Sequence, residues 1–406
     1  MKSRLNSLNH TLSIARNSSL YSKKLDTYPK QLQDIRELTT LPFTTKAELR
    51  EHYPYGSLSV LMSDVIEVHT SSGTTGKATL SFYTADDLIA SSTAISEAWK
   101  CFGLNSESRV QFMMSYGLFS GAAINTYAIQ KLGALVVPSG IQSAEKQIQM
   151  MIDFKIDTIV ATIGYYHYLY DYIIENNIPL KELSLKRGIA AGEIYSNEVR
   201  SDVEQKFNIN IFDHYGLCEV NTGIAYECEF KSGLHFLDDY VIAEIIDPTS
   251  GQSLPSNTEG ELVLTTLKKD ASPLIRYRTG DITEMLSSEC PCGRKSNRIN
   301  RIKRRIDDLI FIKGIKIDPY ELKEFILKIS DGQIYSDIKI KIHGELQKIS
   351  PEILVTLKNF KDEKFLNLIR EAIKDETLVN FKVSHVPKEY FKREDTNKMK
   401  FVEYVK

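Results

Sequence analysis

The sequence predicts an α/β protein in which a large N-terminal α/β domain carries a β-rich extension and is followed by a small C-terminal α+β domain. Short apolar runs alternate with amphipathic helical patterns up to about residue 162, which is typical of a parallel sheet with helical crossovers. Antiparallel patterns follow from about residue 240, and a lysine-rich α+β pattern follows residues 305–316. We therefore predict domains at 1–306 and 307–406.

The individual elements of this fold follow in order along the chain. A strand is expected at 65–69, and Thr84 is expected to N-cap the next helix because Asp86 and Asp87 stand in its first turn. The alternation continues with strands at 109–114, 134–138 and 157–162 and helices at 121–132 and 143–154. Residues 240–246 and 260–267 predict an antiparallel hairpin, interpreted as a second, β-rich layer. In the C-terminal domain we expect helices at 319–328 and 362–374 and strands at 338–342, 353–357 and 381–386.

The overall composition restricts the kinds of partner that the protein is expected to bind. The formal net charge is −2 at pH 7, with basic and acidic residues interleaved, which argues against binding to nucleic acid or to a membrane surface. No apolar run approaches the ~18–20 residues of a membrane span, and residues 1–19 lack the apolar core of a signal peptide. A cytoplasmic location is therefore expected. The 5 cysteines do not make a disulfide framework in a chain of this length, so we expect free thiols or metal ligands.

A polar loop follows the first predicted strand, and its residues are Thr70, Ser71, Ser72, Gly73, Thr74, Thr75, Gly76 and Lys77. Backbone N–H groups and hydroxyls in such a loop can surround a phosphate, and glycines let the backbone come close. The spacing differs from that of a P-loop, because Ser71 stands five positions before Gly76 and Ala78 follows Lys77. An ordinary P-loop ATPase is therefore disfavoured. The alternative interpretation is a flexible surface turn.

Residues 69–77 resemble the signature loop of the adenylate-forming superfamily, which includes acyl-CoA synthetases, adenylation domains of peptide synthetases, and luciferases. Further segments resemble the phenylacetate–coenzyme A ligase family within it, and these are 116–121, 191–193, 215–219, 276–281 and 305–308. The resemblance extends from about residue 10 to the C-terminus, in the family's motif order. It implies the adenylate-forming fold. It also implies an enzyme that uses ATP to convert a carboxylic acid, expected to be aromatic, into an acyl-adenylate. The acyl group would then pass to coenzyme A (CoA), and AMP would be released.

The resemblance also implies which residues bind ATP. Tyr215, next to Gly216, would stack on adenine, and Glu219 would bind Mg²⁺, which prefers oxygen ligands. Asp281 would accept hydrogen bonds from both ribose hydroxyls, and Arg305 would contact ribose or phosphate. The other implied residues of the nucleotide site are the loop Thr70–Lys77 and Ala191, Gly192 and Glu193. Taken alone, Glu219 would be interpreted as a surface carboxylate on a polar loop. Arginines 276 and 278 could equally be structural ion-pair formers.

The small C-terminal domain is implied to be a mobile lid. Asp307 matches the hinge residue of the resembled family, about which the lid would turn between adenylation and thioester formation. Such a rotation exchanges the groups around one phosphate, since adenylation requires a cation that thioester formation does not. Gly314 and Lys316 would lie in the loop that faces CoA after the rotation.

The cation for adenylation is implied to be a lysine near the C-terminus. Lys398 aligns best with the family's Gly-Lys dipeptide, although Asn397 stands where the glycine is expected. Asparagine tolerates left-handed backbone geometry, so the replacement is compatible with the same turn. Lys400 is the alternative, and either lysine could instead be a solvated tail residue. The predicted catalytic residues are therefore Lys398, Glu219 and Asp307.

A second candidate metal site combines cysteine and histidine side chains. Cys228, His235, Cys290 and Cys292 supply the Cys₃His composition of many closed structural Zn²⁺ sites. Their spacing is not that of a standard zinc finger, although some members of the resembled family carry a similar set at matching positions. The alternative is that the four side chains never meet.

The acid is expected to bind beside Met114, Tyr116 and Phe119. In the resembled family an aromatic residue often stands where Met114 is, so an aromatic or mid-sized apolar monocarboxylate is expected, with phenylacetate itself in question. Two alternatives to acyl transfer onto CoA stay open. The acceptor could be a carrier-protein thiol, an amine or the hydroxyl of a cofactor, or the chain could bind nucleotide without turnover. A homodimer is implied by the resemblance alone.

Overall fold

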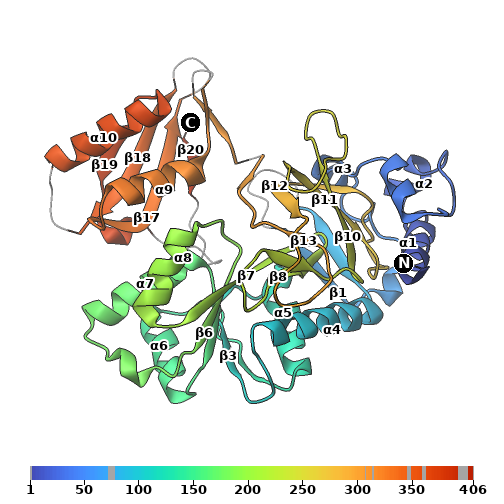
Figure 1. Ribbon diagram of the computed structural model, residues 1–406, viewed down its shortest axis with the longest axis horizontal. Coiled ribbons are helices and arrows are strands. Elements are labelled where there is room, and N and C mark those ends of the chain that lie inside the picture. Colours follow the sequence, from blue (N-terminus) through green and yellow to red (C-terminus); the bar gives the residue numbers. More distant parts are fainter. Residues whose placement is uncertain are drawn as a thin grey trace. The chain divides into compact units, whose positions relative to one another are not determined.

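The computed structural model describes residues 2–71, 78–306, 308–312, 315–344, 349–358, 363–391 and 401–405 (Figure 1). Contacts within the chain define two compact units. Unit 1 comprises residues 1–161, 179–192 and 208–303, and unit 2 comprises residues 162–178, 193–207 and 304–406. Unit 2 therefore contains the C-terminal hundred or so residues together with two segments from the middle of the chain. Among the described residues, no helix is both long enough and apolar enough to span a membrane.

A mixed sheet runs through unit 1. Its parallel part has the strand order β4-β3-β5-β6-β7, with β3 at Arg109–Phe112, β4 at Leu135–Val137, β5 at Thr158–Ala161, β6 at Arg187–Ala191 and β7 at Asn210–Leu217. The predicted strands and the parallel arrangement of this part are confirmed. Strand β7 extends to Leu217, so that Tyr215 lies within it.

The β-rich region continues the same sheet in the order β7-β8-β9-β13-β12-β11-β10. These strands are β8 at Asn221–Glu227, β9 at Leu234–Phe236, β10 at Val241–Ile246, β11 at Glu259–Thr266, β12 at Tyr277–Leu286 and β13 at Arg298–Ile299. The predicted hairpin corresponds to β10 and β11, which pair antiparallel. The interpretation of this region as a separate second layer is wrong. The short strand β13 pairs with both β12 and β9, so the two regions form one hydrogen-bonded sheet.

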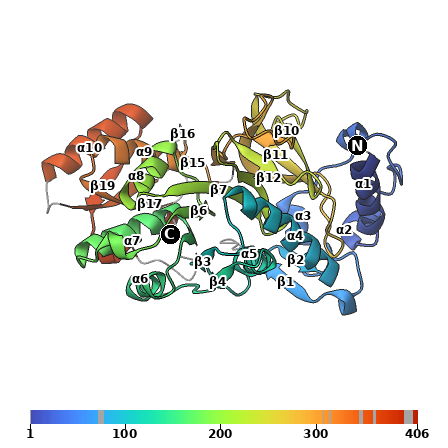
Figure 2. The same cartoon turned by 60° about the horizontal axis from the view of Figure 1, so that its bottom comes forward.

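Helices and a two-stranded sheet complete unit 1. The helices are α1 at Lys2–Ala15, α2 at Ser19–Lys24, α3 at Lys46–Glu51, α4 at Ala85–Cys101, α5 at Ser120–Lys131 and α6 at Ala144–Asp153, with 3₁₀ turns η1 at Ile35–Thr40, η2 at Met62–Asp64 and η3 at Leu180–Glu182. Strands β1, Glu67–Thr70, and β2, Leu80–Tyr83, pair antiparallel. Helix α4 begins as predicted, because the Thr84 hydroxyl and the Asp87 carboxylate form a capping box. Figure 2 shows α4 beside α5, and both helices pack on β8.

Unit 2 is an α+β assembly. Its elements are α7 at Ile163–Glu175, α8 at Asn197–Phe207, β14 at Arg304–Arg305, β15 at Ile310–Ile312, β16 at Ile315–Ile317, α9 at Pro319–Ile329, β17 at Ile334–His343, β18 at Ser350–Leu357, α10 at Glu363–Thr377, β19 at Lys382–His385, η4 at Lys388–Tyr390 and β20 at Val402–Val405. The sheet order is β19-β18-β17-β20, and α9 and α10 bury their apolar faces with this sheet in one core. The predicted helices and strands of this region are confirmed, whereas β20, which pairs parallel to β17, was not predicted.

Candidate nucleotide and metal sites

The turn between β7 and β8 presents Glu219. Gly216 makes this turn possible, because an added Cβ there would lie 2.2 Å from the carbonyl carbon of Thr222. Any other residue would collide with the backbone of β8. The side chain of Glu219 is only 5 % exposed, so the carboxylate sits in a buried environment rather than on the surface. The interpretation of Glu219 as a surface carboxylate is therefore wrong.

Two side chains of unit 1 contact the Glu219 carboxylate. The Thr79 hydroxyl donates to Glu219 Oε1 at 2.8 Å, and Lys46 Nζ at the start of α3 lies 3.4 Å from the same oxygen. Thr79 Oγ1 also lies 2.7 Å from Ser71 Oγ, in the first described part of the predicted phosphate loop. Burial raises the pKa of Glu219, but Lys46 and the hydrogen bonds outweigh it and leave the pKa below its ordinary value. Glu219 is therefore an anion beside this loop.

Tyr215 and Asp281, predicted to bind adenine and ribose, meet in the structure. The Tyr215 hydroxyl donates to Asp281 Oδ2 at 2.6 Å. Asp281 lies within β12 rather than in a turn, at an irregularity where Val263 pairs with Arg278 but Glu261 pairs with Ile282. Gly280 there has a φ of +76°, a conformation that glycine adopts without strain. The structure thus brings the two residues that are predicted to bind the nucleoside into direct contact.

The two arginines of the same segment have structural roles. Arg276 Nη2 lies 2.9 Å from Glu244 Oε1, and its Nη1 donates to the carbonyls of Thr39 and Leu41. Arg278 pairs with Glu261, a buried residue of β11. Both arginines therefore tie strands and loops of unit 1 together, which agrees with the interpretation as ion-pair formers.

Ala191 ends β6, and Gly192 follows it with a φ of +77°. The Glu193 carboxylate accepts a hydrogen bond of 3.0 Å from the backbone N–H of Gly164 in the first turn of α7. Thr162, the N-cap residue of that helix, forms no side-chain cap, so Glu193 supplies the missing acceptor. Nucleotide binding by these three residues stays a prediction, and Glu193 has a structural contact that the sequence did not reveal.

The residues predicted for the lid lie only partly within the described part of the chain. Arg305 is in β14 of unit 2, and Lys316 is an exposed residue of β16. Nearby, the Tyr320 hydroxyl donates to Asp308 Oδ2 at 3.1 Å. The other residues predicted for the lid lie outside the described residues, and these are Asp307, Gly314, Lys398 and Lys400. The same holds for the phosphate-loop residues Ser72, Gly73, Thr74, Thr75, Gly76 and Lys77.

The three residues predicted for the acid pocket lie in unit 1, in the segment that connects β3 to α5. Met114 and Tyr116 are half-buried against a core that also contains Phe112, and the Tyr116 hydroxyl lies 2.6 Å from Thr126 Oγ1. Phe119 is the N-cap residue of α5. A hollow of about 430 Å³ between β4 and α6 is lined by other residues. The acyl-binding role of the three stays a prediction.

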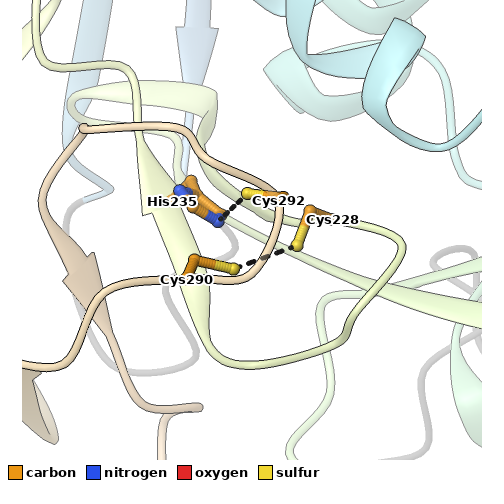
Figure 3. A group of neighbouring side chains, drawn as sticks. All are labelled: Cys228, His235, Cys290 and Cys292. Atoms are coloured by element: carbon orange, nitrogen blue, oxygen red, sulfur yellow. Dashed lines mark hydrogen bonds between the residues drawn. The ribbon is translucent and has the colours of Figure 1, made fainter.

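The four cysteine and histidine residues predicted as metal ligands converge in unit 1 (Figure 3). Cys228 Sγ lies 3.6 Å from Cys290 Sγ, and Cys292 Sγ lies 3.4 Å from His235 Nε2. All four donor atoms lie within 4.8 Å of one another, and all cysteines are free. The alternative that these side chains never meet is wrong.

Two of the donor separations in this cluster match those of a tetrahedral metal site. Zn²⁺ bonds of about 2.3 Å to sulfur and about 2.0 Å to nitrogen place two sulfur ligands about 3.8 Å apart and a sulfur–nitrogen pair about 3.5 Å apart. The observed 3.6 Å and 3.4 Å agree with these values. The other ring nitrogen, His235 Nδ1, lies 3.0 Å from the Ser296 hydroxyl, so the ring is oriented with Nε2 toward the cysteines.

Comparison with known proteins places the chain in a family. A model described as AMP-binding enzyme matches residues 18–266, more than half of the chain. The chain belongs to the AMP-binding enzyme family. It is 36 % identical over 328 residues to phenylacetate-coenzyme A ligase of Pseudomonas putida, covering 80 % of this chain and 74 % of that protein. With the enzyme of the same name from Thermus thermophilus it shares 30 % identity over 393 residues, 92 % of this chain and 88 % of that protein. The predicted family is confirmed.

Solved structures of other proteins have folds similar to that of this chain. A 2-hydroxyisobutyryl-CoA ligase in complex with 2-HIB-AMP matches with a TM-score of 0.88 at 22 % identity, covering 100 % of this chain and 89 % of that chain. An anthranilate CoA ligase in complex with anthranoyl-AMP matches with a TM-score of 0.63 at 16 % identity, covering 84 % and 66 %. The predicted adenylate-forming α/β fold is confirmed.

Two connections in this AMP-binding enzyme cross the end of the matched region at residue 266. Tyr215 and Glu219 lie inside it, whereas Asp281 and the Cys290–Cys292 pair lie beyond it. The Tyr215–Asp281 hydrogen bond and the Cys228–Cys290 contact therefore attach residues beyond 266 to the matched part.

Sequence reasoning missed three side chains that contact Glu219. Lys46 and Thr79 approach its carboxylate, and Lys269 Nζ donates to its backbone carbonyl at 3.0 Å. Lys269 stands between Lys268 and Asp270, and such a charged run is typical of a solvated turn. The sequence therefore contained no signal for a buried lysine at this position.

Proposed function

We propose that this AMP-binding enzyme activates a carboxylic acid with ATP and transfers the acyl group to CoA. Carboxylate attack on the α-phosphorus would give an acyl-adenylate and pyrophosphate, and attack by the CoA thiol would then give the thioester and AMP. The Tyr215–Asp281 pair, in the same unit as the buried Glu219 anion, carries the proposal. Kinship with proteins named phenylacetate-coenzyme A ligase supports it.

In this scheme, described residues of unit 1 would bind the nucleoside and the metal ion. Tyr215 offers a ring face to adenine, and the Asp281 carboxylate offers acceptors to the ribose hydroxyls. Glu219 is the candidate ligand for Mg²⁺, which would neutralise the phosphate charge that develops during attack. The fit rests on a buried, ionised oxygen donor beside Ser71 and Thr79. Lys46 balances the charge of this donor.

The lid part of the proposal concerns residues 307–406. Lys398, or Lys400 as the alternative, would support adenylation, whereas Gly314 and Lys316 would face CoA after rotation about Asp307. Lys398→Ala is expected to abolish pyrophosphate formation but to spare CoA attack on synthetic acyl-adenylate, and Asp307→Pro to do the reverse by stiffening the hinge. Equal losses in both assays would contradict the assigned role of the changed residue.

The acid is proposed to be an aromatic or mid-sized apolar monocarboxylate bound beside Met114, Tyr116 and Phe119. The deciding experiment measures ATP-dependent pyrophosphate release for a panel of aryl and aliphatic acids, each with and without CoA. Turnover with one acid that requires CoA would support the proposal and identify the substrate class. Release that is indifferent to CoA would instead favour a carrier-protein thiol, an amine or a cofactor hydroxyl as acceptor. No release with any acid, together with ATP binding, would favour a binding protein.

The Cys/His cluster is proposed to hold structural Zn²⁺ through Cys228, His235, Cys290 and Cys292. Zinc bound there would crosslink the connection between β8 and β9 to the segment between β12 and β13. All positions would be filled by protein ligands, so the ion would have no open site for a substrate. A homodimer is a further part of the proposal, and light scattering of the purified protein tests it.

A further inference from the structure

The loop between β11 and β12 carries a lysine whose side chain is completely enclosed. Lys269 is 1 % exposed, and its Nζ lies 4.3 Å from the centroid of the Tyr83 ring. A lone buried ammonium is costly, so one is retained only where hydrogen bonds or charges compensate it. The contacts of Lys269 therefore indicate what it does.

The ammonium of Lys269 makes hydrogen bonds to two separate segments. It donates to Ser81 Oγ at 2.5 Å, and to the backbone carbonyls of Glu219 at 3.0 Å and Val220 at 3.1 Å. An ammonium has three N–H donors and no acceptor, so these bonds use its full capacity. One cation thus links β2 to the turn that presents Glu219.

The loop around Lys269 is itself held on both sides. The Asp87 carboxylate, which caps α4, accepts from the backbone N–H groups of Asp270 at 2.6 Å and Ala271 at 2.9 Å. Ser272 exchanges hydrogen bonds with the backbone of Phe82 in β2. Lys269 therefore extends from a firmly held loop rather than from a mobile one.

These contacts control where the Glu219 carboxylate lies. Thr79, which donates to that carboxylate, precedes Ser81 by two positions, and alternate residues of an extended segment point to the same side. Lys269 holds Ser81 on one side and the Glu219 backbone on the other. The ammonium thus binds the backbone of Glu219 directly and holds the strand residue two positions after Thr79.

We propose that Lys269 is a positioning residue that fixes the Glu219 carboxylate for Mg²⁺–ATP. The proposal deepens the proposed function and rests on it. Mg²⁺ requires nearly ideal octahedral geometry, and a misplacement of about 1 Å in an active site can cost about 10²-fold in rate.

The test compares Lys269→Met with Lys268→Met, which removes the neighbouring exposed lysine. For Lys269→Met we expect the Mg²⁺ concentration for half-maximal pyrophosphate release to rise about tenfold and the saturated rate to fall about 10²-fold. Attack of CoA on synthetic acyl-adenylate, which involves no pyrophosphate, should change less than about threefold. Lys268→Met should match the wild type in both assays. Equal losses in both half-reactions, or an unchanged Mg²⁺ requirement, would overturn the proposal.

A second variant guards against misfolding of Lys269→Met. Ser81→Ala removes one acceptor of the ammonium, and we expect a two- to fivefold rise, roughly, in the Mg²⁺ requirement of adenylation. An unchanged requirement in this variant would overturn the proposal. If the wild type adenylates no acid, the proposed function fails, and calorimetric titration of ATP with and without Mg²⁺ still tests Lys269. The Mg²⁺-dependent gain in ATP affinity should then be smaller in Lys269→Met, and an equal gain would refute the positioning role.

Discussion

The two polar clusters of unit 1 neutralise their charges in different ways. At the Glu219 cluster the protein supplies its own cations. Lys46 lies beside the carboxylate, and Lys269 donates hydrogen bonds to the backbone carbonyls of Glu219 and Val220. At the Cys/His cluster the donor atoms of the four side chains face one another within 4.8 Å. A carboxylate balanced by a lysine that is 31 % exposed can exchange this partner for another cation. If these cysteines are thiolates, they would require a bound cation, which the proposed zinc would supply.

This difference separates the expected effects on function and on stability. The Glu219 cluster should be dispensable for folding and essential for adenylation, because the Mg²⁺ proposed for it would bind and leave with ATP. The Cys/His cluster should be essential for folding, because its metal would replace packing that the short strands β9 and β13 do not provide.

The largest effect is expected for Glu219→Gln. Loss of the charge should reduce adenylation by about 10³-fold, or about 4 kcal/mol, because an amide is a poorer Mg²⁺ ligand. The free energy of unfolding should change by less than about 1 kcal/mol, because Lys46 can turn to solvent. Pyrophosphate release and calorimetry check both values. A rate within threefold of the wild type would remove Glu219 from the mechanism.

Cys290→Ser should show the opposite behaviour. We expect wild-type protein to contain about one equivalent of zinc, and the variant to lose it together with about 3 kcal/mol of stability, or roughly 5–10 °C in Tm. Elemental analysis and scanning calorimetry measure this. Cys101→Ser, at the end of α4 and outside the cluster, is the matched control and should retain the metal. Wild-type protein with well under one equivalent would reject the site.

Substitutions in the Tyr215–Asp281 pair should change the affinity for ATP rather than the free energy of unfolding. Asp281→Ala is expected to weaken ATP binding about 30-fold, since it removes charge-assisted hydrogen bonds worth about 2 kcal/mol. Tyr215→Phe keeps the ring and loses one hydroxyl, so about a threefold loss is expected. Titration calorimetry measures both. Equal losses in the two variants would indicate that their mutual hydrogen bond, rather than the ribose contact, determines affinity.

A smaller effect than that of Asp281→Ala is expected for Ser296→Ala, which removes the partner of His235 Nδ1. Metal affinity should fall about tenfold, because the outer hydrogen bond orients the ligand ring. Competition with a chromophoric chelator measures the change, and stability in excess zinc should match the wild type. An unchanged affinity would show that the ring is oriented by packing alone.

The sequence predicted local features accurately where they depend on nearby residues. Thr84 caps α4 as expected, and Ser143 caps α6 at the expected start of that helix. Both agree because a cap depends on residues within a few positions. Strand β20 and the joining strand β13 were not anticipated, since each is short and pairs with distant segments. The position of Asp281 in a strand rather than a turn depends on an irregular register with β11, which no local pattern encodes.

The sequence by itself determined the family, the order of the elements and the chemical types of the candidate ligands. The tertiary structure decided which of these groups meet. Cys228 and Cys290 lie 62 positions apart, and Lys269 lies 50 positions from Glu219, so their contacts depend on strand order. Burial decided the rest, because a lysine in a charged run is solvated unless the fold encloses it and supplies acceptors for all its donors.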